Sequence, residues 1–324
     1  MNNNFIKNIE IINYKCFDNF KVDGFKRVNL IGGLNNIGKT SFMEACLICS
    51  ADSYGDIYHR LREIKTHRNL INNFLAGTQR QEDIQKLIVE NQNLYFKCNN
   101  EDIYIKFIDE LYNLKIIGKP LKTIDYTTLF NTLDQNIQYT FMSFTLSYIS
   151  AFSDFNEMYN MAISELKLNN KLEILNEYLL KMFDISKIDT IRDEPYLMID
   201  KWVKLSETGQ GIKTFINIIF SMFILENRTL FIDEIENGIH YSLFDEFWEI
   251  VLTLSTERNI QVFATTHSKE CIESYNRVSK KLNDTDTVYF EIAKNKKTKK
   301  LFMRNLDSEQ LEYELTHQGR YRGE

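Results

Sequence analysis

The sequence predicts an α/β fold built around a mostly parallel β-sheet. In the last third of the chain, helical runs alternate with two short apolar runs, "TLFIDE" and "IQVFATTH", that have the character of buried strands. Earlier, the strand-like residues 27–31 lead through a glycine-rich turn into an apolar helix that begins at Lys39. Such alternation favours right-handed βαβ units, and ligands then bind at the carboxyl ends of the strands.

The composition is that of an ordinary globular protein. The chain has 324 residues, 44% of them hydrophobic and 26% charged, with a net charge of −6, so no global basic field attracts nucleic acid. No apolar stretch reaches the roughly 18 residues of a membrane helix, and the N-terminus lacks a signal-peptide pattern. With an odd number of cysteines, five, we expect a cytoplasmic protein with reduced thiols and no membrane association.

Local patterns predict the elements in order. Residues 5–31 have the pattern of strands, the helix from Lys39 extends to about Ser50, and residues 56–92 are expected to be mainly helical. The runs "NLYFKC" and "IYIKFI" predict two strands joined by a turn at residues 99–102. Residues 121–185 are expected to be mostly helical, although "QYTFMSFT" could form a strand.

The glycine-rich turn has the spacing of a phosphate-binding loop, Gly33-x-x-x-x-Gly38-Lys39-Thr40. Its backbone N–H groups and the N-terminus of the following helix would hold an anion, Lys39 would neutralise the β- and γ-phosphates, and the Thr40 hydroxyl would bind Mg²⁺. A chance match in a strand–turn–helix is the less favoured alternative. The residues that we expect to bind ATP are Gly33, Asn35, Asn36, Ile37, Gly38, Lys39, Thr40 and Ser41.

Two acids end the first apolar run of the C-terminal third. Asp233 is expected to hold Mg²⁺ and Glu234 to polarise the attacking water, which is the Walker B pattern. A surface turn would explain the pair without any chemistry, but the upstream phosphate-binding loop favours the catalytic interpretation.

His267 ends the next strand-like run, "IQVFATTH". A histidine at this edge could contact the γ-phosphate and the attacking water, so we expect it to be catalytic together with Glu234 and Lys39. The structural alternative is a helix N-cap region, because Thr266 and Ser268 are good capping residues.

A second anion site is predicted in "LSETGQG", directly before the apolar helix that contains Phe215. Ser206 and the backbone N–H groups near Gly209 and Gly211 would form it. Since one nucleotide needs one such loop, the second would contact the γ-phosphate bound by another subunit. A plain capped turn is the alternative.

Taken together, these motifs resemble those of the ABC-type ATPase heads of the RecF, SMC and OLD group, and most closely the small prokaryotic AAA-domain ATPases related to OLD. The resemblance implies a P-loop NTPase with an ABC ATPase-like head: a mostly parallel core sheet, an N-terminal antiparallel β layer and a helical lobe. It also implies ATP and Mg²⁺ as cofactors and a homodimer or higher homo-oligomer with ATP between the heads. The signature residues acting in trans would be Ser206, Gly209, Gln210 and Gly211, and the D-loop residues at the subunit interface Glu236, Asn237, Gly238 and His240.

The chain departs from this group in several respects. Its signature reads Ser-Glu-Thr-Gly-Gln-Gly, and no Q-loop glutamine can be placed; Gln79, Gln81 and Gln138 are candidates. No heptad run fills the interval between the loop and the signature. We expect a single head over residues 1–324 with an inserted β and helical lobe at approximately 51–200.

A nuclease domain is not expected. The 57 residues after His267 (324 − 267) are too few for the Toprim domain of OLD nucleases, and we interpret Asp284-x-Asp286 as a turn. The basic runs "HRLREIKTHR" and "KNKKTKK" are interpreted as a solvated helical face and a hairpin tip, respectively.

The favoured function is an ATP-hydrolysing switch whose heads dimerise around ATP and control a separate effector, a nuclease or toxin, with phage defence as one setting. The alternative is a RecF-like ATPase that acts directly on DNA in repair or maintenance. A non-hydrolysing binding module is disfavoured because Lys39, Asp233 and Glu234 are all present.

Overall fold

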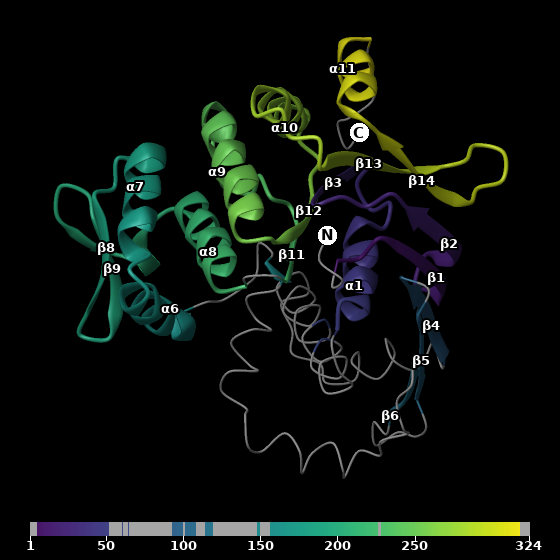
Figure 1. Ribbon diagram of the computed structural model, residues 1–324, viewed down its shortest axis with the longest axis horizontal. Coiled ribbons are helices and arrows are strands. Elements are labelled where there is room, and N and C mark those ends of the chain that lie inside the picture. Colours follow the sequence, from purple (N-terminus) through teal and green to yellow (C-terminus); the bar gives the residue numbers. More distant parts are fainter. Residues whose placement is uncertain are drawn as a thin grey trace, which may run out of the picture.

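The computed structural model of the chain describes residues 5–51, 60, 64, 93–99, 101–107, 114–118, 148–149, 156–225 and 228–317. Three sheets are present in these residues, with helices on both sides of the largest one (Figure 1). No helix in the described ranges combines the length and the apolar character needed to cross a bilayer.

The largest sheet has six strands in the order β14-β13-β3-β12-β11-β7. All neighbouring pairs are parallel except β13 and β14. The strands are β3 (Val28–Gly33), β7 (Tyr148–Ile149), β11 (Thr229–Ile232), β12 (Gln261–Thr265), β13 (Thr287–Lys294) and β14 (Leu301–Leu306). The predicted mostly parallel core sheet is therefore confirmed.

Both faces of this sheet are buried, which explains why its strands are apolar throughout. Side chains alternate between faces along a strand. Leu230 and Ile232 pack with the helices on one face, whereas Phe231 belongs to the cluster on the other. There Phe231 stacks on Phe263, with 5.4 Å between ring centroids.

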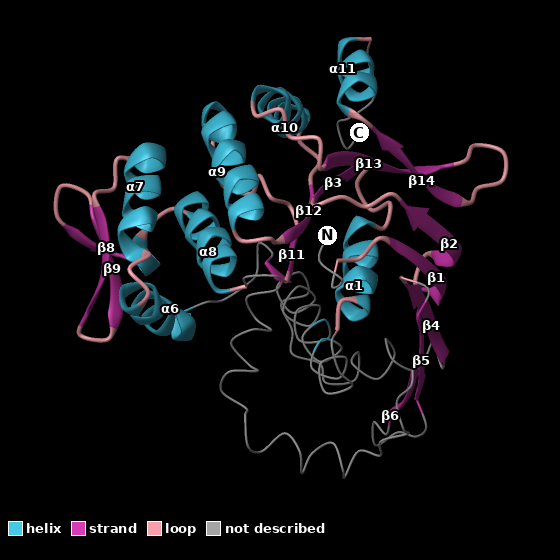
Figure 2. Cartoon of the chain, in the orientation of Figure 1, coloured by secondary structure: helices cyan, strands magenta, loops and turns pink. Residues whose placement is uncertain are grey.

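Helix α1 (Lys39–Cys49) lies between the large sheet and a second, antiparallel sheet (Figure 2). Every residue of α1 from Phe42 to Cys49 is buried, including Cys46 and Cys49, so these two cysteines are packing residues. The second sheet has the order β2-β1-β4-β5-β6 and confirms the N-terminal antiparallel layer. Its strands are β1 (Asn8–Tyr14), β2 (Phe17–Asp23), β4 (Asn93–Cys98), β5 (Glu101–Phe107) and β6 (Leu114–Gly118).

The turn expected at residues 99–102 is shorter than predicted. Glu101 already pairs with Cys98, and Asp102 pairs with Lys97. The polar side chain of Asp102 is compatible with a strand because it is exposed. The strand β6 was not predicted.

The opposite face of the large sheet is covered by helices. The helices are α8 (Gln210–Ile224), α9 (Phe244–Glu257) and α10 (Lys269–Lys281), with α11 (Ser308–Thr316) beyond them. Helix α8 is buried from Thr214 to Phe223 and α9 along its apolar side, as the fully enclosed Phe215 and Trp248 illustrate.

A lobe precedes α8 in the chain. It contains the expected helices α6 (Asn156–Leu168) and α7 (Leu172–Phe183). It also contains an antiparallel sheet that was not predicted, made of β8 (Lys187–Ile191), β9 (Glu194–Met198) and β10 (Trp202–Lys204). The limits of the predicted insertion at 51–200 stay a prediction. Much of that range, including the glutamines at 79, 81 and 138, the "QYTFMSFT" run and most of "HRLREIKTHR", lies outside the described residues.

Three polar features receive structural explanations. Asp284 and Asp286 form a turn, as expected, and both form ion pairs with the buried guanidinium of Arg27. Arg60, the only residue described between positions 59 and 63, is buried against Leu47 rather than on a solvated face. The run "KNKKTKK" is the tip of the β13–β14 hairpin, as predicted.

Candidate functional site

The loop between β3 and α1 requires glycine at two positions. Gly33 and Gly38 have φ angles of 137° and 108°. A Cβ atom on Gly33 would lie 2.6 Å from the carbonyl oxygen of Ile292, and one on Gly38 would lie 2.6 Å from Cys16 Sγ. Because other residues avoid these φ values and no space is available, only glycine fits here.

The N-terminus of α1 is open to an anion. Its N-cap residue, Gly38, offers no side-chain cap to the N–H groups of the first turn. The Lys39 ammonium donates hydrogen bonds to the carbonyl oxygens of Gly33 and Leu34, at 2.9 and 3.0 Å. Burial lowers the pKa of Lys39, and the nearby carboxylates, Asp233 first among them, oppose that shift.

The two predicted nucleotide motifs meet at the ends of β3 and β11. The Thr40 hydroxyl donates a hydrogen bond to Asp233 Oδ2 at 2.9 Å, and Thr265 donates to Asp233 Oδ1. Thr265 also accepts the Glu234 N–H at 2.9 Å, while the Tyr148 hydroxyl lies 3.4 Å from Asp233 Oδ2. These are oxygen donors of the kind that Mg²⁺ prefers. Within the described ranges no group of three or more His, Cys, Asp or Glu residues could by itself hold a metal.

Glu234 has an unusual backbone and a half-exposed side chain. Its φ angle is 55°, in the left-handed region that non-glycine residues seldom adopt, and its side chain is 49% exposed. Burial of the other half raises the pKa of its carboxyl, as does the charge of Asp233, whereas His267 acts in the opposite direction. A carboxylate in this environment suits a general base.

His267 follows β12 and faces two acids. Its ring Nδ1 lies 3.9 Å from Glu234 Oε1 and 3.2 Å from Glu236 Oε1. The N-cap of α10 is formed by Ser268, whose Oγ accepts the Cys271 N–H. The N-cap of α10 is therefore formed by Ser268 and not by His267. The ring of His267 faces the predicted catalytic carboxylate of Glu234.

The predicted signature is exposed at the N-terminus of α8. Ser206, Gly209 and Gln210 are exposed, and in the described part of the chain no atom beyond the flanking residues lies within 4 Å of where a Gly209 Cβ would be. Gly209 is the N-cap and provides no side-chain cap. No hydrogen bond or ion pair joins this turn to the phosphate-binding loop in the part of the chain that the structure describes.

The predicted D-loop is held by its own chain at two points. A Cβ atom on Gly211 would lie 2.0 Å from the Gly238 carbonyl oxygen, so the two backbones are in direct contact. Glu236 is only 9% exposed, and its carboxylate contacts His267 of the same chain. The expected contact of the D-loop across a subunit interface stays a prediction, and Gly238 and His240 are exposed.

Sequence reasoning missed Thr265 and Tyr148, which both contact Asp233. Thr265 could have been found from the sequence, because its hydroxyl ends a buried strand two residues before His267. No local pattern indicated Tyr148, because β7 has only two residues.

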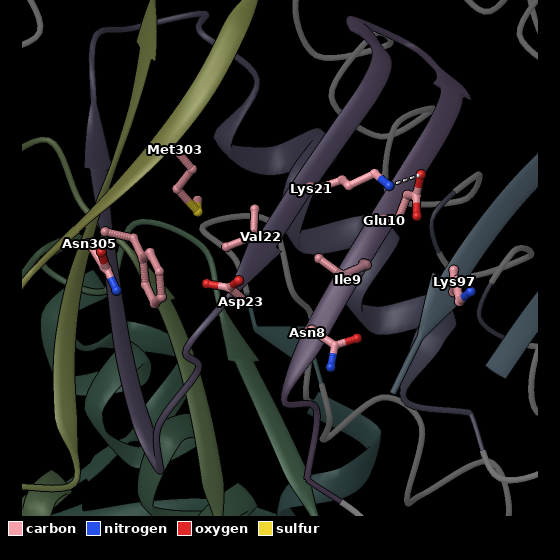
Figure 3. Close-up of a pocket in the computed structure, with 10 residues that line it drawn as sticks. Asn8, Ile9, Glu10, Lys21, Val22, Asp23, Lys97, Met303 and Asn305 are labelled. Carbon is pink, nitrogen blue, oxygen red and sulfur yellow. Dashed lines mark ion pairs between the residues drawn. The ribbon is translucent and has the colours of Figure 1, made fainter. Parts of the chain in front are cut away.

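A pocket elsewhere in the molecule lies between the ends of β1–β2 and β14 (Figure 3). Polar side chains line much of it, and Lys21 forms an ion pair with Glu10 at 2.9 Å. None of its lining residues belongs to the predicted nucleotide site.

Comparisons with known proteins support ATPase activity. Residues 126–272 match the AAA ATPase domain family, a span that includes the signature, both acids and His267. An ATP/GTP phosphatase from Helicobacter pylori (strain ATCC 700392 / 26695) is 29% identical over an alignment of 330 positions. The alignment covers 84% of this chain and 88% of the relative.

Solved structures of SMC heads have the same fold. A head bound to the C-winged helix domain of ScpA matches with a TM-score of 0.57 and 10% identity, over 94% of this chain and 99% of that one. A head with an extended coiled coil, bound to the C-terminal domain of ScpA derived from Pyrococcus furiosus, gives 0.54 and 10%, over 97% and 99%. The fold is that of an ABC-type ATPase head, and the domain match and the phosphatase relative support ATPase activity.

Proposed function

We propose that the chain is an ATP-hydrolysing switch in which two copies close around ATP and a separate effector protein responds to the closed state. One observation carries the proposal. The predicted signature turn at Ser206–Gly209 precedes a helix that has no side-chain cap, whereas the loop at Gly33–Thr40 is joined to Asp233 of the same chain by the hydrogen bond from the Thr40 hydroxyl.

The residues of one copy would bind and hydrolyse the nucleotide. Lys39 and the first turn of α1 would hold the phosphates, and Thr40 and Asp233 would hold Mg²⁺, which neutralises charge on the phosphates when bound. Glu234 would take a proton from the attacking water. His267, beside Glu234, would contact that water or the γ-phosphate.

A second copy would complete the site. The Ser206 hydroxyl and the free N–H groups at the start of α8 would donate to the γ-phosphate of the facing subunit. Each charge-assisted hydrogen bond contributes about 1.5–3 kcal/mol, and a symmetric dimer has two such sites. Loss of the γ-phosphate removes much of this energy, so ADP would favour separated copies.

The effector would be a nuclease or toxin, and antiviral defence by a relative of the OLD group would be the setting. The solved SMC heads support a role for a partner, because both are bound to a domain of ScpA. An effector of this kind should co-purify with Glu234→Gln in ATP and not with Lys39→Ala.

The test of the shared site is the mass of Glu234→Gln in solution. With saturating ATP and Mg²⁺ we expect twice the mass of one chain, and with ADP the mass of one chain. Adding Ser206→Arg should restore the single mass without changing ATP affinity. A Glu234→Gln protein that stays monomeric in ATP contradicts the proposal.

A mixing experiment tests the same idea through activity. Ser206→Arg and Lys39→Ala should each be inactive alone, because every composite site contains one damaged half. A mixed dimer keeps one site with both halves intact, so turnover should partly return. No recovery over a range of mixing ratios would contradict site sharing.

Direct binding to DNA is a second candidate function, favoured by the hairpin between β13 and β14. Five lysines are exposed at its tip, and β13 runs parallel to β3, so the hairpin leaves the sheet at the same edge as the phosphate-binding loop. The five lysines are Lys294, Lys296, Lys297, Lys299 and Lys300.

Fluorescence anisotropy of labelled duplex DNA at several salt concentrations tests this candidate. Replacing the five lysines by glutamine should weaken binding and lower the salt dependence by about 0.9 in slope for each lysine that had neutralised a phosphate. ATP turnover without DNA serves as the control for folding. Equal DNA affinity in parent and variant would exclude the hairpin as a DNA-binding element.

A further inference from the structure

Glu236 is a buried acid that contacts both the backbone and the ring of His267. Its Oε1 accepts the His267 N–H at 2.9 Å, and the same oxygen lies 3.2 Å from the ring Nδ1. Glu236 is 9% exposed, whereas the ring of His267 is 43% exposed. Oε1 of Glu236 therefore contacts both the backbone and the ring of His267, from the buried side of the ring.

The turn that carries Glu236 is well fixed. The Ile235 N–H donates to the Thr265 carbonyl at 3.0 Å, the Asn237 N–H donates to Glu234, and the Ile239 N–H donates to Glu236. The backbone contact between Gly238 and Gly211 adds a further restraint. A carboxylate on such a turn has little freedom to move away from His267.

The second oxygen of Glu236 has no hydrogen-bond partner. Oε2 is buried and unpaired among the residues that the structure describes. A buried charged oxygen without a partner costs stability, so a glutamate is an expensive choice if its role were only to pack. Packing alone would be better served by an apolar side chain, and the contact with His267 supplies a reason for the acid.

We propose that Glu236 is a positioning residue that holds the His267 ring with Nδ1 toward the protein and Nε2 toward the reacting phosphate. A carboxylate can only accept hydrogen bonds, so the ring nitrogen beside it carries the proton. Nε2 is then presented to the nucleotide in one defined orientation. The inference rests on the proposed function of this site, because that function supplies the phosphate.

Glu234 does not fill this role. It lies 3.9 Å from the same Nδ1, and its side chain is 49% exposed. Its place at the open side of the ring suits contact with water, while Glu236 holds the ring from the buried side.

A kinetic double-mutant cycle tests the proposal. Glu236→Ala should lower kcat by about 10–100-fold, the range found when a partner that orients a histidine is removed, and leave KM for ATP unchanged. Glu236→Gln should keep most of the activity, since its amide oxygen can still accept. In the His267→Ala background, Glu236→Ala should cause no further loss.

Nitrogen-15 NMR of the His267 ring gives a readout that does not depend on turnover. The parent and Glu236→Gln should show one tautomer with the proton on Nδ1, and Glu236→Ala a mixture. The signal is assigned by its loss in His267→Ala, and thermal unfolding identifies the variants that are folded.

Two results would overturn the proposal: losses in kcat that add fully between Glu236→Ala and His267→Ala, or an unchanged tautomer in folded Glu236→Ala. A parent that does not hydrolyse ATP, or a Glu234→Gln variant that turns over normally, would instead refute the proposed function. In that case the NMR measurement still decides whether Glu236 orients the ring.

Discussion

The chain has two helix N-termini of similar build but different surroundings. Both α1 and α8 begin at an uncapped glycine, and each has an early lysine that donates to carbonyl oxygens of the preceding turn, Lys39 at Gly33 and Lys213 at Ser206. Around the start of α1 the chain supplies Asp233 and Thr40, whereas among the described residues no atom beyond the flanking ones lies within 4 Å of where a Gly209 Cβ would be. The proposed nucleotide site therefore has its polar partners within the chain, whereas the proposed signature site would find its phosphate on a second copy.

The two lysines give the largest test of this difference. Lys39→Ala removes a half-buried cation that would contact two phosphates, at about 1.5–3 kcal/mol each, so the Kd for ATP should rise at least about 100-fold. The matched variant Lys213→Ala should leave ATP binding by one chain unchanged. Binding is measured by calorimetry with Glu234→Gln as the parent, so that hydrolysis does not interfere.

Equal losses of affinity in the two variants would break the comparison, because both helices would then contribute to the same nucleotide within one chain. Unchanged affinity in both would remove Lys39 from the nucleotide site.

The two signature glycines give the next largest effect. A methyl group on Gly211 would lie 2.0 Å from the Gly238 carbonyl oxygen, so Gly211→Ala should destabilise the protein by about 1–3 kcal/mol through overpacking. The control, Gly209→Ala, adds a methyl group in open space and should change the free energy of unfolding by less than about 0.5 kcal/mol. Urea unfolding of both variants measures the difference.

If Gly211→Ala were as stable as the parent, the contact between the signature and the D-loop would be loose. The start of α8 would then have no close backbone contact with the turn that carries Glu236.

The smallest expected effect is on the pH dependence of kcat/KM. It concerns Glu234, an acid beside the start of α1 that has no counterpart at the start of α8. Burial and Asp233 raise the pKa of Glu234, so this carboxyl takes up a proton at a higher pH than an ordinary glutamate. A general base works only when ionised, and kcat/KM should therefore fall, as pH decreases, at a pH above about 4.3. The pH profile of the parent measures this, and an acid limb at or below the ordinary value would contradict it.

Much of the fold was predictable because its signals are local. The alternation of Leu230, Phe231 and Ile232 toward opposite buried faces produces an apolar run that indicates a core strand. In α8 the spacing of Phe215, Ile218 and Met222 has the helical period, although every residue from Thr214 to Phe223 is buried. The β8–β10 sheet was missed because its strands are short and half exposed, so no clear alternation marks them.

By itself the sequence determined the phosphate-binding loop, the paired acids and the position of His267, because each depends on residue types at fixed spacing near a strand end. Only the tertiary structure decided which of these side chains touch. Strand β3 lies between β12 and β13 in the sheet, and neither β2 nor β4, the strands next to it in the sequence, lies beside it. This position depends on the whole sheet. That order brings Thr40 to Asp233, 193 residues away, and Glu236 to His267, 31 residues away. Contacts between strand ends depend on the order of strands across the sheet, and no local spacing encodes that order.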